Sequence, residues 1–310
     1  METRALGRTG IEMPRIILGC GNFGGIGSAP AFFGQGESAE QAFAIMDAAW
    51  AAGITAFDTA DAYGGGRSET YIGEWMRSRG LRPLLTTKTF NPMHEGGDSG
   101  LSRDRIRRQL ESSLERLGVE RVELYLAHAM DPSAPLEETV DAFDELRQAG
   151  KILAWGGSNV DSTWVEQAQP ASVQNSYSLL DRADEAGVLE VCARAGTGYT
   201  PFSPLAGGWL TGKYRRGVAP PQGSRMALRP EPYAHLRDDA VFDALEAFES
   251  QAAERQTTPA ALAIAWLLAH PQVTAVVIGP RRPEQLQPAL DAIALDLSRD
   301  ERDAITELFP

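Results

Sequence analysis

Short apolar runs alternate with longer amphipathic stretches along most of this chain. Each apolar run is five or six residues long and rich in Val, Ile, Leu and Thr, a composition typical of strands buried in a parallel sheet. The stretches between the runs place apolar residues three and four positions apart, which is the spacing of one helix face. This pattern predicts eight strands, at 15–19, 54–58, 84–88, 122–127, 152–156, 171–175, 198–202 and 274–278.

A helical stretch follows every predicted strand. Eight consecutive strand-then-helix units indicate an α/β fold with right-handed crossovers, and eight is the number of parallel strands that closes a barrel. We therefore expect a (β/α)8 TIM barrel, with an open doubly wound sheet as the alternative. The helices are expected at 38–52, 67–79, 102–117, 136–149, 161–168, 183–195, 238–255 with a second piece at 259–269, and 283–293, and a last helix is expected to start after Ser298 as its N-cap.

The rest of the chain completes this outline. Two short runs joined by GRTG at 7–10 predict an N-terminal β-hairpin before the first barrel strand. No linker rich in Pro, Gly or Ser divides the chain, so residues 1–310 are expected to form a single domain. Three polar stretches rich in Gly and Pro, 25–37, 91–101 and 212–235, each follow a predicted strand. Loops in that position form the active-site face of a barrel, so these three are the candidate functional loops.

Charge and composition argue against some classes of binding partner. The formal net charge of −13 opposes binding to nucleic acid or acidic lipid. The longest apolar run, 259–269, is too short to span a bilayer, and the first ten residues lack the apolar centre of a secretory signal. Cys20 and Cys192 lie far apart with no Cys-x-x-Cys motif, which fits a reducing, cytoplasmic compartment. We expect a small-molecule substrate, no nucleic-acid or membrane partner, and we find no motif that indicates an oligomeric state.

Four chemically useful side chains follow consecutive predicted strands. Asp58 ends the second strand, Lys88 ends the third, and His128 follows the fourth, while Tyr63 lies five residues after Asp58. Each has an ordinary interpretation when it stands alone: a helix cap for the aspartate, a solvated lysine, a satisfied polar histidine. Because the carboxyl ends of parallel strands meet at one end of a barrel, we expect all four to converge.

Such a quartet suits the reduction of a carbonyl group. A phenol has a pKa near 10 and is a weak acid at neutral pH, whereas a neighbouring ammonium stabilises the phenolate and lowers that pKa. Here Lys88 would act on Tyr63 in this way, and Asp58 would keep the lysine charged and oriented. The imidazole of His128 can donate a hydrogen bond to a substrate oxygen. The predicted outcome is a general acid aimed at a developing oxyanion.

Several separate strings resemble one known family. FDTADAYGGGRSETYIGE (57–74), AGKILAWGGSN (149–159), VQNSYSLLDR (173–182) and PFSPLAGGWLTGKY (201–214) resemble motifs of the aldo-keto reductase superfamily, and the resemblance runs in order to nearly the last residue. The chain is most similar to the short bacterial barrels of that superfamily. The resemblance implies an NAD(P)H-dependent oxidoreductase that acts on CH–OH or carbonyl groups. It assigns Tyr63 as proton donor, Lys88 and Asp58 as the pair that tunes it, and His128 as the residue that orients the carbonyl.

The resemblance also implies a set of nicotinamide contacts. The side chains of Ser158, Asn159 and Gln174 match those that hold the carboxamide, and Phe202 matches an aromatic that stacks on the ring. Amides, hydroxyls and an aromatic face are the groups that a flat carboxamide-bearing ring requires. Further matched positions are Gly21, Asn22 and Phe23 in the loop under the cofactor, and Ser203, Leu205, Gly207 and Lys213 toward the phosphates.

The adenine end of the cofactor is expected at VVIGPRRPEQLQ (276–287). No G-x-G-x-x-G motif follows the first strand, so a Rossmann-type phosphate loop is weakly supported. Barrels often bind phosphate after strands seven and eight, and the resemblance matches Gly279, Arg281 and Gln285, while Arg282 offers a second guanidinium. The family's acidic residue and Asn are replaced by Pro288 and Ala289. We expect NADPH, because two arginines suit a 2′-phosphate, with NADH as the alternative.

Two other functions remain open at this stage. Some relatives act as cofactor-binding regulatory subunits of ion channels with little turnover. A metal-dependent hydrolase would need ligands such as Asp58, His94 and His128, although the chain has only four histidines and no His-x-His. The substrate itself is not encoded. Its expected wall is apolar and aromatic, formed by Phe23, Tyr63, Phe32, Phe33, Phe90, Met93 and Trp209.

Overall fold

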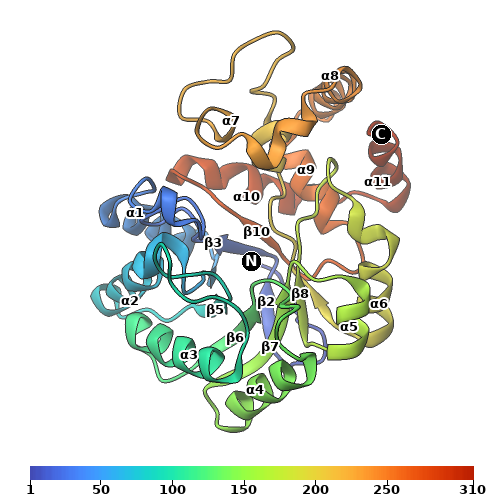
Figure 1. Cartoon of the computed structure of the whole chain (residues 1–310). Helices are drawn as coiled ribbons and strands as arrows, with labels where there is room; N and C mark the ends of the chain where they lie inside the picture. Colours follow the sequence, from blue (N-terminus) through green and yellow to red (C-terminus); the bar gives the residue numbers. More distant parts are fainter.

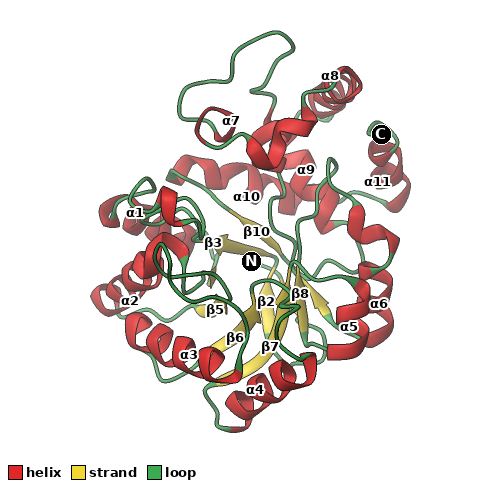
Figure 2. Cartoon of the chain, in the orientation of Figure 1, coloured by secondary structure: helices red, strands yellow, loops and turns green.

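Parallel strands form the centre of the molecule in the computed structural model of residues 1–310 (Figures 1 and 2), and the sheet contains eight of them. They are β3 (Ile16–Gly19), β4 (Ala56–Asp58), β5 (Leu84–Thr89), β6 (Val122–Ala127), β7 (Ile152–Ser158), β8 (Ser172–Gln174), β9 (Gly198–Tyr199) and β10 (Val276–Ile278). Each strand pairs in parallel with the next, and β10 pairs with β3. A parallel bridge between Tyr199 and Val273 joins β9 to the segment that leads into β10 and closes the ring. The prediction of a (β/α)8 barrel is therefore confirmed, and the open doubly wound sheet is wrong.

Helices surround the strands (Figure 2), and their residue ranges are close to the predicted ones. Ser38 and Ser298 both form capping boxes, in which the serine side chain accepts from the third helical N–H and the side chain of that residue accepts in return. The helices are α1 (Ala39–Ala51), α2 (Arg67–Arg79), α3 (Arg103–Leu117), α4 (Leu136–Gln148), α5 (Ser162–Ala168), α6 (Val188–Ala195), α8 (Asp239–Glu254), α9 (Pro259–Leu268), α10 (Gln287–Ala294) and α11 (Arg299–Thr306). None combines the length and the apolar character needed to cross a membrane.

The predicted loops hold short helices that the sequence pattern did not indicate. The loop at 25–37 contains η1 (Pro30–Phe32), and the loop at 212–235 contains α7 (Arg225–Leu228) and most of η5 (Glu231–Leu236). These segments are three to six residues long, too short for a helical period to be visible. The long 212–235 loop extends away from the ring beside α8 (Figure 1).

The N-terminal hairpin closes one end of the barrel. Strands β1 (Thr3–Ala5) and β2 (Glu12–Pro14) pair antiparallel, as predicted. Leu6, Ile11 and Met13 are buried in a cluster with side chains from inside the ring, among them Leu124 and Val277. Apolar burial at this end seals the interior, so that the opposite, carboxyl-terminal rim is the end left to carry polar chemistry.

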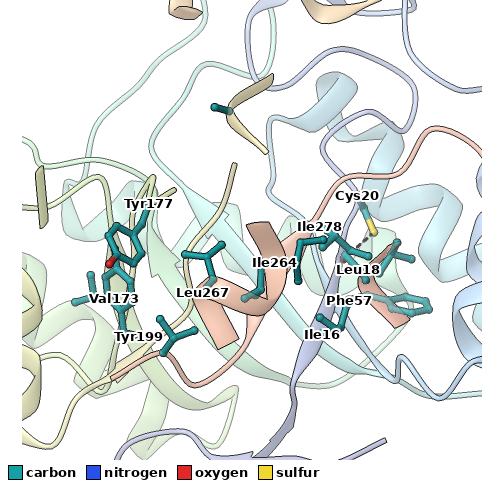
Figure 3. Packing of buried hydrophobic residues seen from close by; sticks show 14 of the residues in the cluster. Ile16, Leu18, Cys20, Phe57, Val173, Tyr177, Tyr199, Ile264, Leu267 and Ile278 are labelled. Atoms are coloured by element: carbon teal, nitrogen blue, oxygen red, sulfur yellow. Dashed lines mark hydrogen bonds between the residues drawn. The ribbon is translucent and has the colours of Figure 1, made fainter. Parts of the chain in front are cut away.

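The larger core lies between the strands and the helices. It joins 64 buried residues. Ile264 and Leu267 of α9 lie between a group around Tyr199 on one side and Ile278 with Leu18 on the other (Figure 3).

Candidate active site

Lys88 is the centre of a buried polar group at the carboxyl-terminal ends of β4 and β5. Its Nζ donates to Asp58 Oδ1 at 2.5 Å and to the carbonyl of Thr59 at 2.8 Å, and it lies 3.5 Å from Tyr63 Oη. Asp58 and Lys88 come from neighbouring strands, so the parallel register sets their approach. The structure thus brings together three of the four residues predicted to form the quartet.

Tyr63 is aimed at the lysine by the turn that follows it. The segment η2 (Tyr63–Gly66) contains three glycines with positive φ, a conformation that other L-residues adopt only with strain. The three glycines therefore form a tight turn between Tyr63 and α2. Gly21 lies against the other side of the phenol: a Cβ at this position would sit 3.5 Å from the Tyr63 ring.

Burial and charge decide the protonation of this group. Burial opposes the charge on Lys88, but the carboxylate of Asp58 and the phenol of Tyr63 outweigh it and raise the pKa of the lysine. Burial raises the pKa of Tyr63, and Lys88 offsets this only in part. The expectation of an unusually acidic phenol is therefore corrected: Lys88 acts in the predicted direction, but desolvation is the larger effect. Tyr63 is a protonated phenol at neutral pH, with a cation beside it that stabilises the phenolate left after proton transfer.

His128 follows β6 and completes the quartet. Its ring meets the Tyr63 ring edge-on, with centroids 5.5 Å apart. Burial, with the charge of Lys88 added, holds the pKa of His128 well below its usual range, so the imidazole is neutral. Its Nδ1 lies 3.2 Å from the amide nitrogen of Asn91, which can only donate. Nδ1 is therefore the acceptor and Nε2 carries the proton. Asn91, three residues after Lys88, was not predicted.

The residues expected to bind the nicotinamide carboxamide lie directly beside the quartet. Ser158 and Gln174 are paired across β7 and β8. The Gln174 amide donates to Asp58 Oδ2 at 2.8 Å, and the Asn159 amide donates to the carbonyl of His128 at 2.8 Å and to Ser158 Oγ at 3.1 Å. Both amides thus use their N–H groups within the protein and keep a carbonyl oxygen to accept from a carboxamide NH2. The hydrogen bond from Gln174 to Asp58 therefore connects the predicted carboxamide contacts to the predicted catalytic quartet.

The turn after β9 is strained at the predicted phosphate positions. Ser203 and Ala206 have φ of +56° and +45°, values that non-glycine residues rarely adopt, and Gly207 follows with +65°. Tyr233 of η5 folds over this turn: its hydroxyl lies 3.1 Å from Ser203 Oγ, and its ring would meet a Cβ on Gly207. Phe202, half-buried, precedes the turn beside the end of β8.

Cationic side chains gather around this turn, and most have no carboxylate partner. They are Lys213, Arg225, Arg229 and Arg281, here called the cation cluster. Arg282 follows Arg281 in the chain and is exposed. Desolvation and the charges of Arg225 and Arg281 lower the pKa of Lys213, and desolvation with Arg229 and Arg281 lowers that of Arg225. Arg281 alone forms an ion pair, with Glu37. Mutually repelling, unneutralised cations in a chain of net charge −13 fit a polyanionic ligand, such as the phosphates of a dinucleotide. Arg225 was not predicted, because its segment appeared as a plain loop.

The other predicted positions are distributed as follows. Gly279 lies near Asn22, whose amide nitrogen would be 4.0 Å from a Cβ on the glycine. Gln285 accepts a hydrogen bond from the backbone N–H of Arg281 at 2.7 Å. Phe23 is completely buried in the core, so its side chain presents no surface to a ligand. Leu205 is half-buried, and Ala289, where the family has a polar side chain, is buried in the core.

Of the residues expected to form the substrate wall, two lie against the glycine turn after Tyr63. The Phe33 ring is next to Gly65, and the Met93 side chain is next to Gly66. Trp209 does not belong to the wall, because it is 2% exposed and packs against Tyr214 and Phe242 in the core. Its place in the short helix after β9 turns the indole inward.

Two surface hollows away from this rim contain none of the predicted site residues. They have volumes of about 1100 and 950 Å³ and lie at the amino-terminal end, between loops that lead into strands. Their lining is largely charged and polar, with groups such as Arg82, Glu123 and Arg194.

No group of three or more His, Cys, Asp or Glu side chains is arranged to hold a metal ion. His94 is exposed and bonds the adjacent carbonyl of Glu95.

Comparisons with known proteins agree with this geometry. The chain is 35% identical to an uncharacterized oxidoreductase, YrpG, of Bacillus subtilis, across 100% of this chain and 96% of that protein. It is 33% identical to a putative voltage-gated potassium channel subunit beta of Schizosaccharomyces pombe, across 94% and 87%. The solved glycerol dehydrogenase AKR11B4 from Gluconobacter oxydans superimposes with a TM-score of 0.85 at 25% identity, covering 99% of this chain and 94% of that one. The model of the Aldo/keto reductase family matches residues 15–309. The protein belongs to the aldo/keto reductase family and is an oxidoreductase.

Proposed function

We propose that this protein is an NADPH-dependent carbonyl reductase in which Tyr63 is the general acid. The observation that carries the proposal is the buried Lys88, held by Asp58 on one side and facing the Tyr63 hydroxyl at 3.5 Å on the other. Bound NADPH would supply a hydride to the carbonyl carbon of an aldehyde or ketone. The chain's own residues supply the proton and the orientation of the oxygen.

Each member of the quartet has a distinct task in this scheme. Tyr63 donates its proton to the carbonyl oxygen as negative charge develops there, and the Lys88 ammonium stabilises the resulting phenolate. Asp58 keeps that ammonium charged and in place. Neutral His128 donates from Nε2 to the same oxygen, because its Nδ1 is already occupied by Asn91.

The remaining site residues support a dinucleotide. Ser158, Asn159 and Gln174 would hold the carboxamide, and the cation cluster would hold the phosphates. The excess of guanidinium groups supports NADPH over NADH. We further propose that residues 1–310 act as one barrel domain without nucleic-acid partners, and the two free cysteines support a reducing, cytoplasmic location.

The direct test replaces the phenol. Tyr63→Phe removes the proton donor and is expected to lower the rate of NADPH oxidation with benzaldehyde by about 10²–10⁴-fold. The affinity for NADPH, measured by fluorescence titration, should stay within about twofold of the unmodified protein. Tyr71→Phe, which removes a half-buried phenol on α2, is the matched control and should leave both values unchanged. Undiminished turnover in Tyr63→Phe would refute the proposal.

A second function is favoured by the similarity to potassium channel subunits. The similarity to the potassium channel subunit beta suggests a nucleotide-binding regulatory subunit with little turnover. That alternative predicts tight NADPH binding with negligible NADPH oxidation against aldehydes, ketones, sugar aldehydes and quinones. Measurable turnover that depends on Tyr63 decides for the reductase.

A further inference from the structure

Glu37 is a buried carboxylate with an incomplete set of partners. Its residue is 3% exposed, just before the N-cap of α1. Its backbone is fixed on both sides, because its N–H donates to the carbonyl of Asn22 and its carbonyl accepts from Gly24. Oε1 accepts from Arg281 Nε at 2.5 Å, whereas Oε2 is buried and has no hydrogen-bond partner. Arg281 is thus the cation on which this carboxylate depends.

The same arginine joins three segments of the carboxyl-terminal rim. Besides Glu37 in the first loop, its guanidinium donates to the carbonyl of Gly223 in the 212–235 loop at 3.1 Å. Its backbone N–H is held by Gln285 in the segment after β10. Every other member of the cation cluster lacks a carboxylate, so Glu37 is the one negative charge built into this group of cations.

We propose that Glu37 sets the cofactor selectivity of the site by competing with the 2′-phosphate of NADPH for Arg281, so that NADH is accepted alongside NADPH. This inference rests on the proposed function, because it assumes that a nicotinamide dinucleotide binds at the cation cluster. It identifies a determinant in the first loop of the barrel, far in sequence from the segment that carries Arg281.

The physical argument compares the two cofactors at the 2′ position. A 2′-phosphate that takes Arg281 leaves Glu37 buried without its cation and brings two negative charges together, and both effects cost free energy. A 2′-hydroxyl is neutral and does not compete for Arg281, so it leaves the ion pair intact. Glu37 therefore penalises NADPH and leaves NADH unaffected. The unpaired Lys213 and Arg225 still attract the phosphates that both cofactors share.

The test measures affinity and does not depend on turnover. Dissociation constants for NADPH and NADH are measured by fluorescence titration for the unmodified protein, Glu37→Gln, Arg281→Gln and the double variant. Glu37→Gln is expected to tighten NADPH binding by about tenfold or more and to change NADH binding by less than about threefold. In the Arg281→Gln background the same substitution should have little effect on either cofactor, since Glu37 acts through that arginine. Glu40→Gln removes an equal charge from an exposed position three residues away and should leave the ratio unchanged.

The outcomes separate this inference from the function on which it rests. If both cofactors bind but Glu37→Gln changes neither affinity, or changes both equally, the inference is overturned and the proposed function stands. If the unmodified protein prefers NADPH by more than about a hundredfold, the inference is overturned without any variant. If neither cofactor binds, both proposals fail together.

Discussion

At the scale of single residues, Lys88 shows how a buried charge is maintained. It is completely buried, and oxygen atoms from Asp58, Thr59 and Tyr63 surround its ammonium. Removing one partner of a buried pair leaves an uncompensated charge, which costs about 3–5 kcal/mol. Lys88→Met is therefore expected to lower the melting temperature markedly and to abolish carbonyl reduction.

The double variant separates stability from chemistry. Lys88→Met combined with Asp58→Asn removes both charges and should recover much of the lost stability, measured by thermal unfolding, but none of the activity. Recovery of activity in the double variant would mean that the ion pair has only a structural role.

The pH dependence of reduction follows from Tyr63 and His128. Reduction needs a protonated phenol, and burial raises the pKa of Tyr63. The proton is therefore lost only above the ordinary phenol value of about 10. Burial and Lys88 lower the pKa of His128, so the imidazole does not gain charge near neutrality. We expect kcat/KM for reduction to be constant from about pH 6.5 to 10, measured with NADPH at saturation. An inflection near pH 7 that is absent from His128→Gln would contradict a neutral imidazole.

The same scale shows what the sequence could predict of the site. Asp58, Lys88 and His128 were predictable because each ends or follows its own strand, and the barrel brings strand ends together. The contact from Gln174 to Asp58 spans 116 positions, and that from Arg281 to Glu37 spans 244. Such contacts depend on side-chain conformations at the rim, which no local pattern encodes. The balance between burial and charge at Tyr63 likewise requires the folded structure.

At the scale of elements, α2 and α3 approach closely at a glycine. A Cβ on Gly73 would lie 2.4 Å from the carbonyl oxygen of Arg116 and 2.9 Å from that of Leu117, both backbone atoms that cannot turn aside. Gly73→Ala should force the helices apart and cost about 1–3 kcal/mol, despite the better helix propensity of alanine.

Glu74→Ala provides the comparison on the same helix. Glu74 is exposed and adjacent, so its replacement should change stability by no more than about 0.5 kcal/mol. Urea unfolding of the two variants checks the difference. Equal midpoints would show that the helix pair relaxes at no cost.

Element boundaries also show where a sequence pattern loses information. The α2 prediction of 67–79 coincides with the helix because Gly66 and Gly80 bound it with positive φ. The strand predicted at 198–202 ends at Tyr199. The N–H groups of Thr200 and Phe202 still donate to the carbonyls of Val173 and Asn175, but Pro201 between them has no N–H to donate on the side of β10. The pattern of apolar residues indicates where a strand is buried, but it does not indicate whether each backbone N–H and C=O group has a hydrogen-bond partner.

At the scale of the whole molecule, apolar packing and the candidate active site lie at opposite ends of the barrel. The hairpin buries apolar side chains at the amino-terminal end, while the quartet and the cation cluster lie at the carboxyl-terminal rim. The barrel itself was predictable from eight repeated units. That the hairpin seals it required the structure, because three-residue strands carry no sign of what they cover.

This separation makes a prediction about Leu6. The side chain is fully buried in the hairpin cluster and lies against Gly198, where an added Cβ would meet its Cδ1 at 2.5 Å. Leu6→Ala leaves a cavity and should cost about 2–5 kcal/mol, seen as a lower melting temperature. Below that temperature the KM for NADPH and the kcat should stay within about twofold of the unmodified values, because the substitution lies at the end opposite the site. Thr3→Ala, an exposed change in the same hairpin, should alter neither stability nor kinetics. A large loss of kcat in folded Leu6→Ala would mean that the two ends of the barrel are coupled, since a change confined to packing at the sealed end has no other route to the proton donor.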